Sequence, residues 1–337
     1  MTDEETPRRA APTIYDVAAR AGVSASTVSR ALNRPGRTNA ATAQRIQLAA
    51  DELGYRLNPM ARSLQTGLTG NLALIVSDIT NPVYFDLVRG AERVTAEAGS
   101  MLLFADSQEN GKIEAEVAGR LMRVADGLIL VGSRLHDAEI VALSKAKPVV
   151  VVNRVVDGLP AVTVESDAGA RAIVDHLHGL GHRRIAYLSG PAASWMNSRR
   201  HEALLRSAEQ VGMSVLTLSA SSPTVDGGSA AVADIIATEA TAVVAFNDLL
   251  AFGVIHGLRA VDRPVPASMS VLGFDDIFGA DLLTPPLTTV RSPLSSIGET
   301  AVRLLQRLIA GETDVRTDQL TTELIVRDST GAAPPPV

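Results

Sequence analysis

From residue 71 onward, the chain alternates short apolar runs with longer stretches whose apolar residues recur every three or four positions. The apolar runs predict buried strands at 72–76, 101–105, 128–131, 149–152, 185–188, 243–246 and 271–274. The amphipathic stretches predict helices at 85–98, 113–124, 168–178, 200–211, 229–237, 249–260 and 295–309. This alternation indicates doubly wound parallel sheets with helices on both faces, and there are enough strands for two sheets.

Before this region, residues 13–33 have the pattern of two short helices joined by a tight turn. Thr13 and Asp16 have the spacing of a capping box, and Gly22 allows the sharp turn. Ser24 can cap the second helix. Its buried positions are Val28, Ala31 and Leu32, and its exposed N-terminal face carries Ala25, Ser26, Ser29 and Arg30. Such a face can enter the major groove of DNA, so the segment predicts a helix-turn-helix.

A third helix is predicted to begin near Asn39 or Thr42 and to end at Gly54. Its apolar positions Ile46, Ala49, Ala50 and Leu53 can close a small three-helix core. A fully capped pattern of this kind also occurs in proteins that do not bind DNA, so the helix-turn-helix alone does not settle the function.

A shorter helix is predicted at 58–67, with a capping Asn58, a proline at the first helical position and a glycine at the end. A helix of this length is marginal in water, because nucleation costs more than so few hydrogen bonds return. We therefore expect it to form when another molecule holds it. Leu64 has polar neighbours, which favours a wedge between DNA base pairs over a core residue.

The distribution of charge supports a DNA-binding segment on an acidic body. Residues 1–66 hold nine Arg and six acidic residues, a net charge of +3, so the remainder carries −9 of the total of −6. Two of the arginines, Arg8 and Arg9, can form a minor-groove arm, but we favour a solvated tail.

In their order and spacing, these motifs resemble the headpiece and hinge of the LacI/GalR (lac repressor/purine repressor) family of transcriptional regulators. The resemblance continues along most of the chain through residues 81–85, 179–185, 190–191, 247–248, 273–276 and 285–289. It implies DNA contacts from the headpiece and the short helix. The expected DNA-binding residues are Thr13, Tyr15, Ser24, Ala25, Ser26, Thr27, Ser29, Arg30, Asn33, Tyr55, Asn58, Ala61, Arg62, Ser63 and Leu64.

The resemblance also implies a periplasmic-binding-protein-like core, with a small effector between two subdomains. Ligands in doubly wound folds lie beyond the carboxyl ends of the strands, where this chain places several polar residues. By similarity, the effector-contacting residues are Tyr84 or Phe85, Asn153, Arg200, Asn247 and Asp275. An arginine, a carboxylate and amides suit hydrogen bonding to vicinal hydroxyl groups.

One position departs from the family pattern. Several relatives have an aromatic residue that stacks on the effector where this chain has Pro223, so we expect Trp195, in a loop at 190–200, to supply the stacking surface instead. We expect a sugar, a polyol or a sugar-derived metabolite, with a nucleobase as the alternative.

Other classes of function lack the residues that they need. The chain has no Cys, which removes disulfides and thiolate catalysis, and its six His residues do not have metal-ligand spacing. We find no nucleophile with its base and no phosphate loop, so an enzyme is not indicated. A periplasmic solute-binding protein would have no use for residues 13–66. Asp275 and Asp276 can form an acid/base pair, but adjacent residues at a strand end point to opposite sides, so we favour one ligand contact and one loop anchor.

The predicted organisation is a flexible tail at 1–12, a helix-turn-helix domain at 13–57, a hinge helix and linker at 58–69, a core at 70–330 and a disordered tail at 331–337. Within the core, the N-subdomain comprises about 70–165 plus 291–320, and the C-subdomain about 166–290 plus 321–330. The expected partners are a double-stranded DNA operator, a small-molecule effector and a second copy of the chain. We expect no cofactor, no metal, no membrane segment and a cytoplasmic location.

Overall fold

The structure is a computed structural model that describes residues 12–33, 38–55, 67–314 and 316–335. It divides the chain into two compact units, Met1–Gly70 and Asn71–Val337. The N-terminal unit contains the helices α1 (Ile14–Ala21), α2 (Ala25–Asn33) and α3 (Ala40–Leu53).

The three helices form by the local signals predicted from the sequence. The capping box of Thr13 and Asp16 is present, and Gly22 ends α1 in the left-handed conformation. Asn39 caps α3 by accepting a hydrogen bond from the amide of Ala41. The helices bury a shared core formed by Val17, Ala18, Ala21, Val28, Ile46, Ala49 and Ala50.

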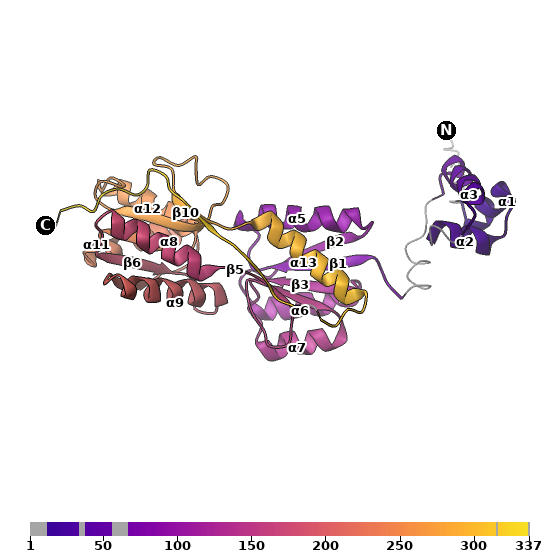
Figure 1. Cartoon of the computed structure of the whole chain (residues 1–337), viewed down its shortest axis with the longest axis horizontal. Coiled ribbons are helices and arrows are strands. Elements are labelled where there is room, and N and C mark those ends of the chain that lie inside the picture. Colours follow the sequence, from indigo (N-terminus) through magenta and orange to yellow (C-terminus); the bar gives the residue numbers. More distant parts are fainter. Residues whose placement is uncertain (1–11, 34–37, 56–66, 315, 336–337) are drawn as a thin grey trace, which may run out of the picture. The chain divides into compact units, whose positions relative to one another are not determined.

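The larger unit contains two six-stranded sheets, one in each subdomain (Figure 1). The N-subdomain sheet has the order β11-β5-β4-β3-β1-β2, and its strand pairs are parallel. Its strands are β1 (Asn71–Val76), β2 (Met101–Asp106), β3 (Gly127–Val131), β4 (Val149–Val152), β5 (Ala161–Val164) and β11 (Asp318–Leu320).

The C-subdomain sheet has the order β12-β10-β9-β8-β6-β7, and β12 is antiparallel to β10 while the other pairs are parallel. Its strands are β6 (Arg184–Ser189), β7 (Ser214–Ser219), β8 (Ala242–Ala245), β9 (Ser270–Asp275), β10 (Thr288–Arg291) and β12 (Glu323–Ile325). The predicted fold class, a helical headpiece followed by two doubly wound sheets, is confirmed.

Nine helices of the described core connect or cover these strands. They are α5 (Val83–Glu97), α6 (Gly111–Leu121), α7 (Asp137–Ala146), α8 (Ser166–Gly179), α9 (Trp195–Gln210), α10 (Val225–Ala230), α11 (Val232–Ala237), α12 (Asp248–Ala260) and α13 (Leu294–Ile309). The single helix expected at 229–237 is wrong, because α10 and α11 are two short helices. The sequence did not predict α7, in which only Ile140 is buried.

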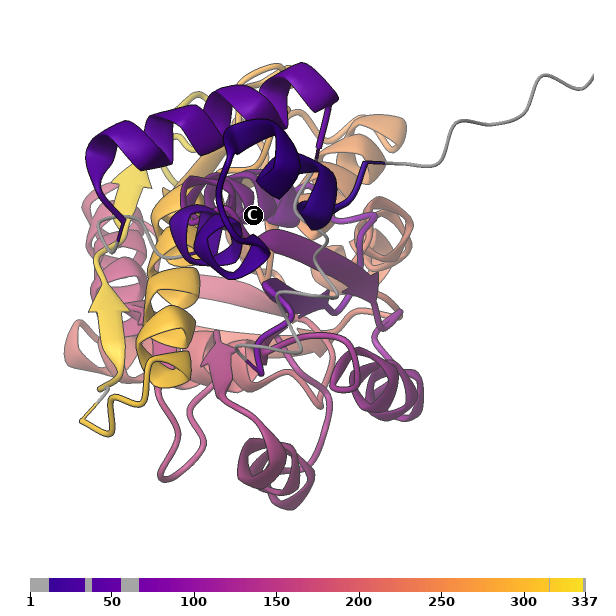
Figure 2. The same cartoon turned by 90° about the vertical axis from the view of Figure 1, so that its right-hand side faces the viewer.

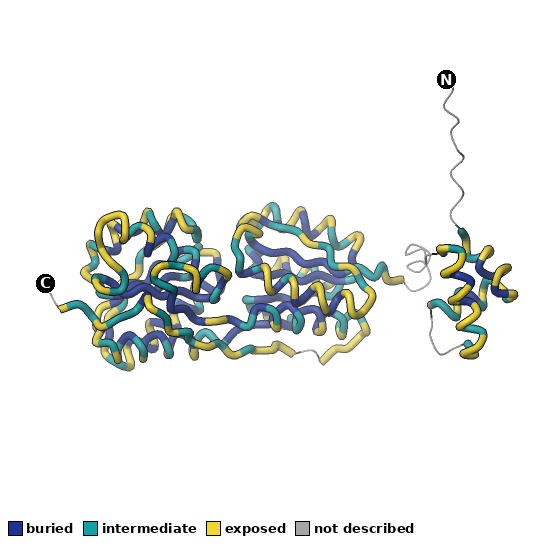
Figure 3. Tube along the Cα trace, turned by 90° about the horizontal axis from the view of Figure 1, so that it is seen from above, coloured by how far each residue is buried: buried dark blue, intermediate teal, exposed yellow. Residues whose placement is uncertain are grey.

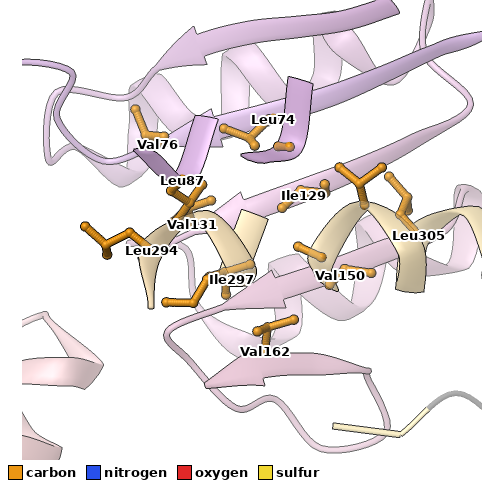
Figure 4. Packing of buried hydrophobic residues seen from close by; sticks show 14 of the residues in the cluster. Leu74, Val76, Leu87, Ile129, Val131, Val150, Val162, Leu294, Ile297 and Leu305 are labelled. Atoms are coloured by element: carbon orange, nitrogen blue, oxygen red, sulfur yellow. The ribbon is translucent and has the colours of Figure 1, made fainter. Parts of the chain in front are cut away.

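Alternate residues along each N-subdomain strand enter different hydrophobic clusters. Leu74 and Val76 pack with α5 and α13 on one face, while Ala73 and Ile75 pack with α6 and α7 on the other. Figure 4 shows the first cluster, and Figure 2 shows α13 and α7 on different sides of this sheet. The inner strands of both subdomains are buried along most of their length, whereas the edge strands β2, β7, β11 and β12 have no buried residue (Figure 3).

The described chain passes between the two subdomains three times, after β5, after β10 and after β11 (Figure 1). Strand β10 of the C-subdomain leads into α13 of the N-subdomain, and β11 of the N-subdomain leads into β12 of the C-subdomain. Each subdomain therefore contains a segment from the C-terminal part of the chain. The two subdomains are therefore joined side by side through three short segments, which is the arrangement that permits hinge closure around a ligand.

The expectation of a disordered tail at 331–337 is wrong for its first part. The amide of Gly331 donates to Ser270 Oγ at 3.1 Å, and the amide of Ala333 donates to the carbonyl of Leu180 at 2.8 Å. His182, which has no exposed surface, contacts Ser270 Oγ and the Gly331 carbonyl through Nε2, each at 3.1 Å. The segment is therefore attached to the C-subdomain through buried polar groups.

No helix in the part of the chain that the structure describes is long and apolar enough to cross a membrane.

Candidate functional site

The first candidate site is the exposed surface of α2. Ser24 Oγ accepts a hydrogen bond from the amide of Thr27 at 3.2 Å, so the serine caps this helix. Ser26 and Arg30 are exposed, and Arg30 Nε donates to the carbonyl of Ser26 at 3.2 Å. Ala25, Thr27 and Ser29 are half-buried. The outward face of the helix therefore presents a hydroxyl group and a guanidinium that can contact the edges of bases.

The remaining expected DNA contacts differ in their surroundings. Tyr15 is 73% exposed on α1, and Thr13 is exposed beside it in the capping box. Tyr55 packs partly against the helical core. The side chain of Asn33 and the residues Asn58, Ala61, Arg62, Ser63 and Leu64 lie outside the described part of the chain, so the role expected for the short helix stays a prediction.

The second candidate site is a cleft between the two subdomains of the core. The N-subdomain residues that line it include Ser77, Asp78, Asn81, Tyr84, Glu109, Ser133, Arg134 and Asn153. The C-subdomain residues include Ser194, Trp195, Arg200, Pro223, Phe246, Asn247 and Asp275. Most of the polar lining residues follow the carboxyl ends of parallel strands, as the fold requires.

Arg200 and Asp275 form the charged centre of the C-subdomain wall. Arg200 Nη2 lies 2.5 Å from Asp275 Oδ1, and Nη1 donates to the carbonyl of Phe246 at 2.7 Å. The guanidinium carbon lies 5.3 Å from the ring centroid of Phe246 and 4.6 Å from that of Phe274. Both charged side chains are less than 10% exposed, so the pair is held rigidly before any ligand arrives.

Asn247 and Asp248 organise the start of α12. Asn247 Oδ1 accepts from the amide of Leu250 at 2.9 Å, and Nδ2 donates to the carbonyl of Pro223 at 3.1 Å. Asp248 accepts from Thr289 Oγ1 at 2.6 Å and from the amide of Ile277 at 2.9 Å. Burial and the neighbouring carboxylate of Asp275 raise the pKa of Asp248 well above its ordinary value. Asn247 thus lines the cleft with a side chain whose polar atoms are already used to cap a helix.

Asp276, next to Asp275, has a different set of partners. Its Oδ2 accepts from Arg291 Nε at 2.7 Å, and its Oδ1 lies 2.7 Å from Arg327 Nη2. Arg291 ends β10 at the second crossing, and Arg327 follows β12 after the third. The two adjacent carboxyl groups therefore serve different purposes: Asp275 faces the cleft and Asp276 anchors segments next to the crossings.

The N-subdomain wall contains Tyr84 and a second charged pair. The hydroxyl of Tyr84 lies 2.7 Å from Ser77 Oγ, and burial raises the pKa of Tyr84 to about 12. Arg134 donates through Nε to Glu109 Oε2 at 2.6 Å and through Nη1 to the carbonyl of Gly132 at 2.6 Å. The Tyr84 hydroxyl is close enough to Glu109, Arg134 and Asp275 for their charges to act on it.

Asn153 lines the cleft and contains a buried acceptor. It adopts the left-handed conformation with φ of 57°, and its Oδ1 is buried without a hydrogen-bond partner in the described structure. A buried polar atom without a partner is costly, and a residue other than glycine in this conformation is uncommon. A ligand hydroxyl or amine that donates to this oxygen would remove the cost.

The structure also decides where the expected aromatic residues lie. Phe85 is 52% exposed and does not line the cleft, because it follows Tyr84 on α5 and points to another side of the helix. Trp195 lines the cleft as the first residue of α9, not in a loop as expected, because Ser194 caps the helix there. Pro223 lies in the cleft as well.

Sequence reasoning missed Glu109, Arg134 and Ser77, all of which line the cleft. They follow β2, β3 and β1, at the same carboxyl edge that identified Asn153 and Asp275. The position rule could have found them, but their polar loops look in sequence like ordinary surface segments.

Comparison with known proteins assigns a family to each part of the chain that carries a candidate site. Residues 13–58 match the lacI family of bacterial regulatory proteins, and residues 174–330 match the periplasmic binding protein-like domain. The chain is 32% identical over 333 residues to the HTH-type transcriptional repressor CytR of Escherichia coli strain K12, an alignment that covers 96% of this chain and 98% of CytR.

Solved structures agree over nearly the whole length. The lac repressor dimer bound to operator and the anti-inducer ONPF superposes with a TM-score of 0.84 at 25% identity, covering 95% of this chain and 99% of the repressor. The complex of the transcriptional regulator CelR with cellobiose gives a TM-score of 0.71 at 30% identity, covering 94% and 99%.

Proposed function

Because this chain belongs to the lacI family of bacterial regulatory proteins, we propose that it represses transcription by binding a palindromic operator as a homodimer, under the control of a sugar or polyol in the cleft. It is a DNA-binding transcriptional regulator and not an enzyme, as are the relatives that it resembles. The operator, the dimer and the class of effector are the proposed parts.

The observation that carries the effector proposal is the cleft between the subdomains. Arg200 and Asp275 on one wall face a lining that includes the unsatisfied Oδ1 of Asn153 on the other. Groups of this kind recognise hydroxyls by hydrogen bonds to both oxygen and hydrogen. The related regulator CelR binds cellobiose in its solved complex, which supports a sugar here. A ligand that contacts both walls prefers one relative orientation of the subdomains and can therefore shift the protein between two states.

The exposed edges of the two sheets support the homodimer. The edge strand β2 carries Met101, which is 64% exposed, and Phe104, and the edge strand β7 carries the exposed Leu216. In the loop after β9, Phe278 and Leu282 are 76% and 69% exposed. Apolar residues at open sheet edges favour association, and a single recognition helix reads only one half-site. The lac repressor that this chain resembles is a dimer on its operator, which is consistent with the proposal.

The proposal is tested in two linked steps. Selection from random double-stranded DNA with the full chain should return a two-fold symmetric motif. A thermal-shift screen of neutral sugars, polyols and nucleobases should then find a compound that raises the melting temperature, changes the Kd for the selected operator and is recovered unchanged. A selection without a symmetric motif would contradict the operator proposal, and a compound that binds without changing the operator Kd would contradict the regulatory one.

A further inference from the structure

We propose that Glu109 is a specificity-determining residue that closes the cleft to anions, so that the effector is a neutral, hydroxyl-rich molecule without phosphate or carboxylate groups. The inference rests on the proposed use of the cleft for the effector and adds the charge that the effector must have. Four observations support it: the partners of Arg134, the partners of Arg200, the first turn of α5 and the net negative charge of the lining.

Each of the three guanidinium nitrogens of Arg134 has a partner before a ligand binds. Its Nε and Nη2 lie 2.6 and 2.5 Å from the same oxygen, Glu109 Oε2, and its Nη1 donates to the Gly132 carbonyl. The Arg134 side chain is 8% exposed, whereas that of Glu109 is 28% exposed. Of the two side chains, the carboxylate of Glu109 is therefore the more accessible one at this wall of the cleft. A ligand that approaches this wall meets an acceptor with negative charge and not a guanidinium.

Arg200 on the opposite wall also has partners in the protein. One nitrogen of its fork contacts Asp275, the other donates to the Phe246 carbonyl, and two phenylalanine rings flank the guanidinium. An anionic ligand would have to displace Asp275 or lie beside it. Displacing one partner of a buried ion pair leaves an uncompensated charge, which is strongly unfavourable.

The first turn of α5, which begins at the cleft, offers little to an anion. The N-terminus of a helix is an anion site only when its first amides are free. At the start of α5, the amide of Val83 donates to Asn81 Oδ1 at 3.1 Å, and the amides of Tyr84 and Phe85 donate to preceding carbonyls. At the start of α9, Asn197 donates its amide to Ser194 Oγ at 3.3 Å.

The charged side chains of the lining carry a net negative charge. The charged residues of the lining are Asp78, Glu109, Asp275, Arg134 and Arg200, three acids against two bases. To these is added the unpartnered Oδ1 of Asn153. A ligand therefore gains most by donating hydrogen bonds, as hydroxyl groups do, and a phosphate would lose its hydration among carboxylates.

The wild-type protein provides the first test. Glucose, trehalose, ribose and cytidine are compared with glucose 6-phosphate, trehalose 6-phosphate, ribose 5-phosphate and cytidine monophosphate by thermal shift, and Kd values are measured by calorimetry. We expect binding among the neutral probes, with the matched phosphate at least about tenfold weaker. A phosphate that binds as tightly as its neutral counterpart, or a neutral series without any binder, would overturn the inference.

The second test changes Glu109 itself. In Glu109→Gln the amide keeps the shape and a hydrogen-bonding oxygen, but Arg134 loses its counter-charge, so the ratio of phosphate to neutral affinity should rise at least about tenfold. Glu116→Gln on the exposed side of α6 removes the same charge outside the cleft and should leave the ratio unchanged. If Glu109→Gln is poorly folded, Glu109→Ala gives the same comparison. An unchanged ratio in a folded Glu109 variant means that Glu109 does not set the specificity.

These results separate the inference from the proposed function. Equal binding of phosphates with a changed operator Kd would refute the role of Glu109 and leave the regulator proposal standing. Selective binding of a neutral sugar without any effect on the operator Kd would do the reverse.

Discussion

At the scale of single residues, the cleft is built from side chains that already have partners. Arg200 with Asp275 and Arg134 with Glu109 form one ion pair on each wall. Asn247 caps α12 through Oδ1 and donates through Nδ2 to the carbonyl of Pro223. Asn153 is the exception, with a buried oxygen that lacks a partner in the described structure. A preorganised wall loses little freedom when a ligand binds, so small differences between ligands decide the affinity.

The Arg200–Asp275 pair gives the first prediction at this scale. Arg200→Ala and Asp275→Ala should each abolish the response of operator binding to the effector, because each removes a ligand partner and leaves the other charge buried. They should also lower the free energy of unfolding by roughly 3 to 5 kcal/mol, since both side chains are less than 10% exposed. Operator Kd with and without effector, and urea unfolding, measure the two effects.

Arg206→Ala on the same helix is the matched control, because Arg206 is 49% exposed and does not line the cleft. It should keep the effector response. A full response in both Arg200→Ala and Asp275→Ala would place the effector site elsewhere.

Arg30 gives the second prediction. It is exposed on α2, and an arginine can bond guanine O6 and N7 together, which is worth roughly 1 to 3 kcal/mol of discrimination. Arg30→Ala should weaken operator binding and flatten the base preference at one symmetric position in each half-site, as read by repeating the DNA selection. Arg20→Ala, which removes a cation paired with Glu52 on the headpiece, should leave the selected motif unchanged. A motif that survives Arg30→Ala would make Arg30 a phosphate contact.

At the scale of elements, the sequence predicted seven of the twelve described strands and missed β5, β7, β10, β11 and β12, of which β5 and most of β10 are buried. The central strands such as β3 and β4 are apolar throughout and were found from their composition alone. The edge strand β7 alternates polar and apolar residues, and β11 and β12 are three residues long, so none of them resembles a buried strand. Their positions depend on pairing with distant strands, which local sequence does not contain.

The sequence predicts the cleft incompletely for the same reason, because part of the cleft depends on the pairing of distant strands. Arg200, Asn153 and Asp275 could be predicted from the sequence, because they follow strands or belong to family motifs. Glu109 and Arg134 are 25 positions apart in polar loops, and their pairing exists only after β2 and β3 take their places on either side of β1. The cap at Ser194 likewise moved the start of α9 to Trp195 and changed that residue from a loop to a helix position.

Asp248 gives a prediction at this scale, because it ties α12 to β10 and to the loop after β9. Its pKa is raised in the folded state, so above the ordinary value of 3.8 the unfolded chain releases a proton that the folded chain retains. Stability from this residue is therefore present at low pH and falls, by up to about 1.4 kcal/mol per pH unit, as the pH rises toward the folded pKa. Asp248→Asn should remove this slope.

The free energy of unfolding of Asp248→Asn, measured by urea at several values from pH 4 to pH 8, checks the sign. The amide can accept from the Ile277 amide and donate to Thr289 Oγ1, so the hydrogen bonds of the protonated acid are preserved. Asp281→Asn, at an exposed position, serves as the control and should retain the wild-type slope. A steeper slope in Asp248→Asn would show that the residue is ionised in the folded protein.

At the scale of the whole molecule, the cleft and the crossings meet at two adjacent residues. Asp275 faces the cleft, and Asp276 holds Arg291 and Arg327 next to the second and third crossings. A ligand that draws the cleft walls together must therefore act on the segments that join the subdomains. This gives a physical connection between the cleft and the relative orientation of the two halves, which is what a regulatory ligand has to change.

Pairing of two chains is the remaining requirement, and Met101 gives its test. Met101 is 64% exposed on the edge strand β2, where an aspartate would place a charge in a proposed apolar interface without disturbing the folded subunit. Met101→Asp should sediment as a monomer. Its operator affinity should fall by roughly 10²- to 10⁴-fold, because the two half-sites would no longer be bound by linked headpieces.

Val261→Asp places the same charge at another exposed apolar position, after α12, and should remain a dimer with wild-type operator affinity. Sedimentation equilibrium and fluorescence anisotropy with the selected operator and with a single half-site measure both properties. For the monomer, the half-site and the full operator should bind with nearly equal affinity, because each headpiece then acts alone. If Met101→Asp stays dimeric and still prefers the full operator, the chains pair through a surface other than the edge of the N-subdomain sheet.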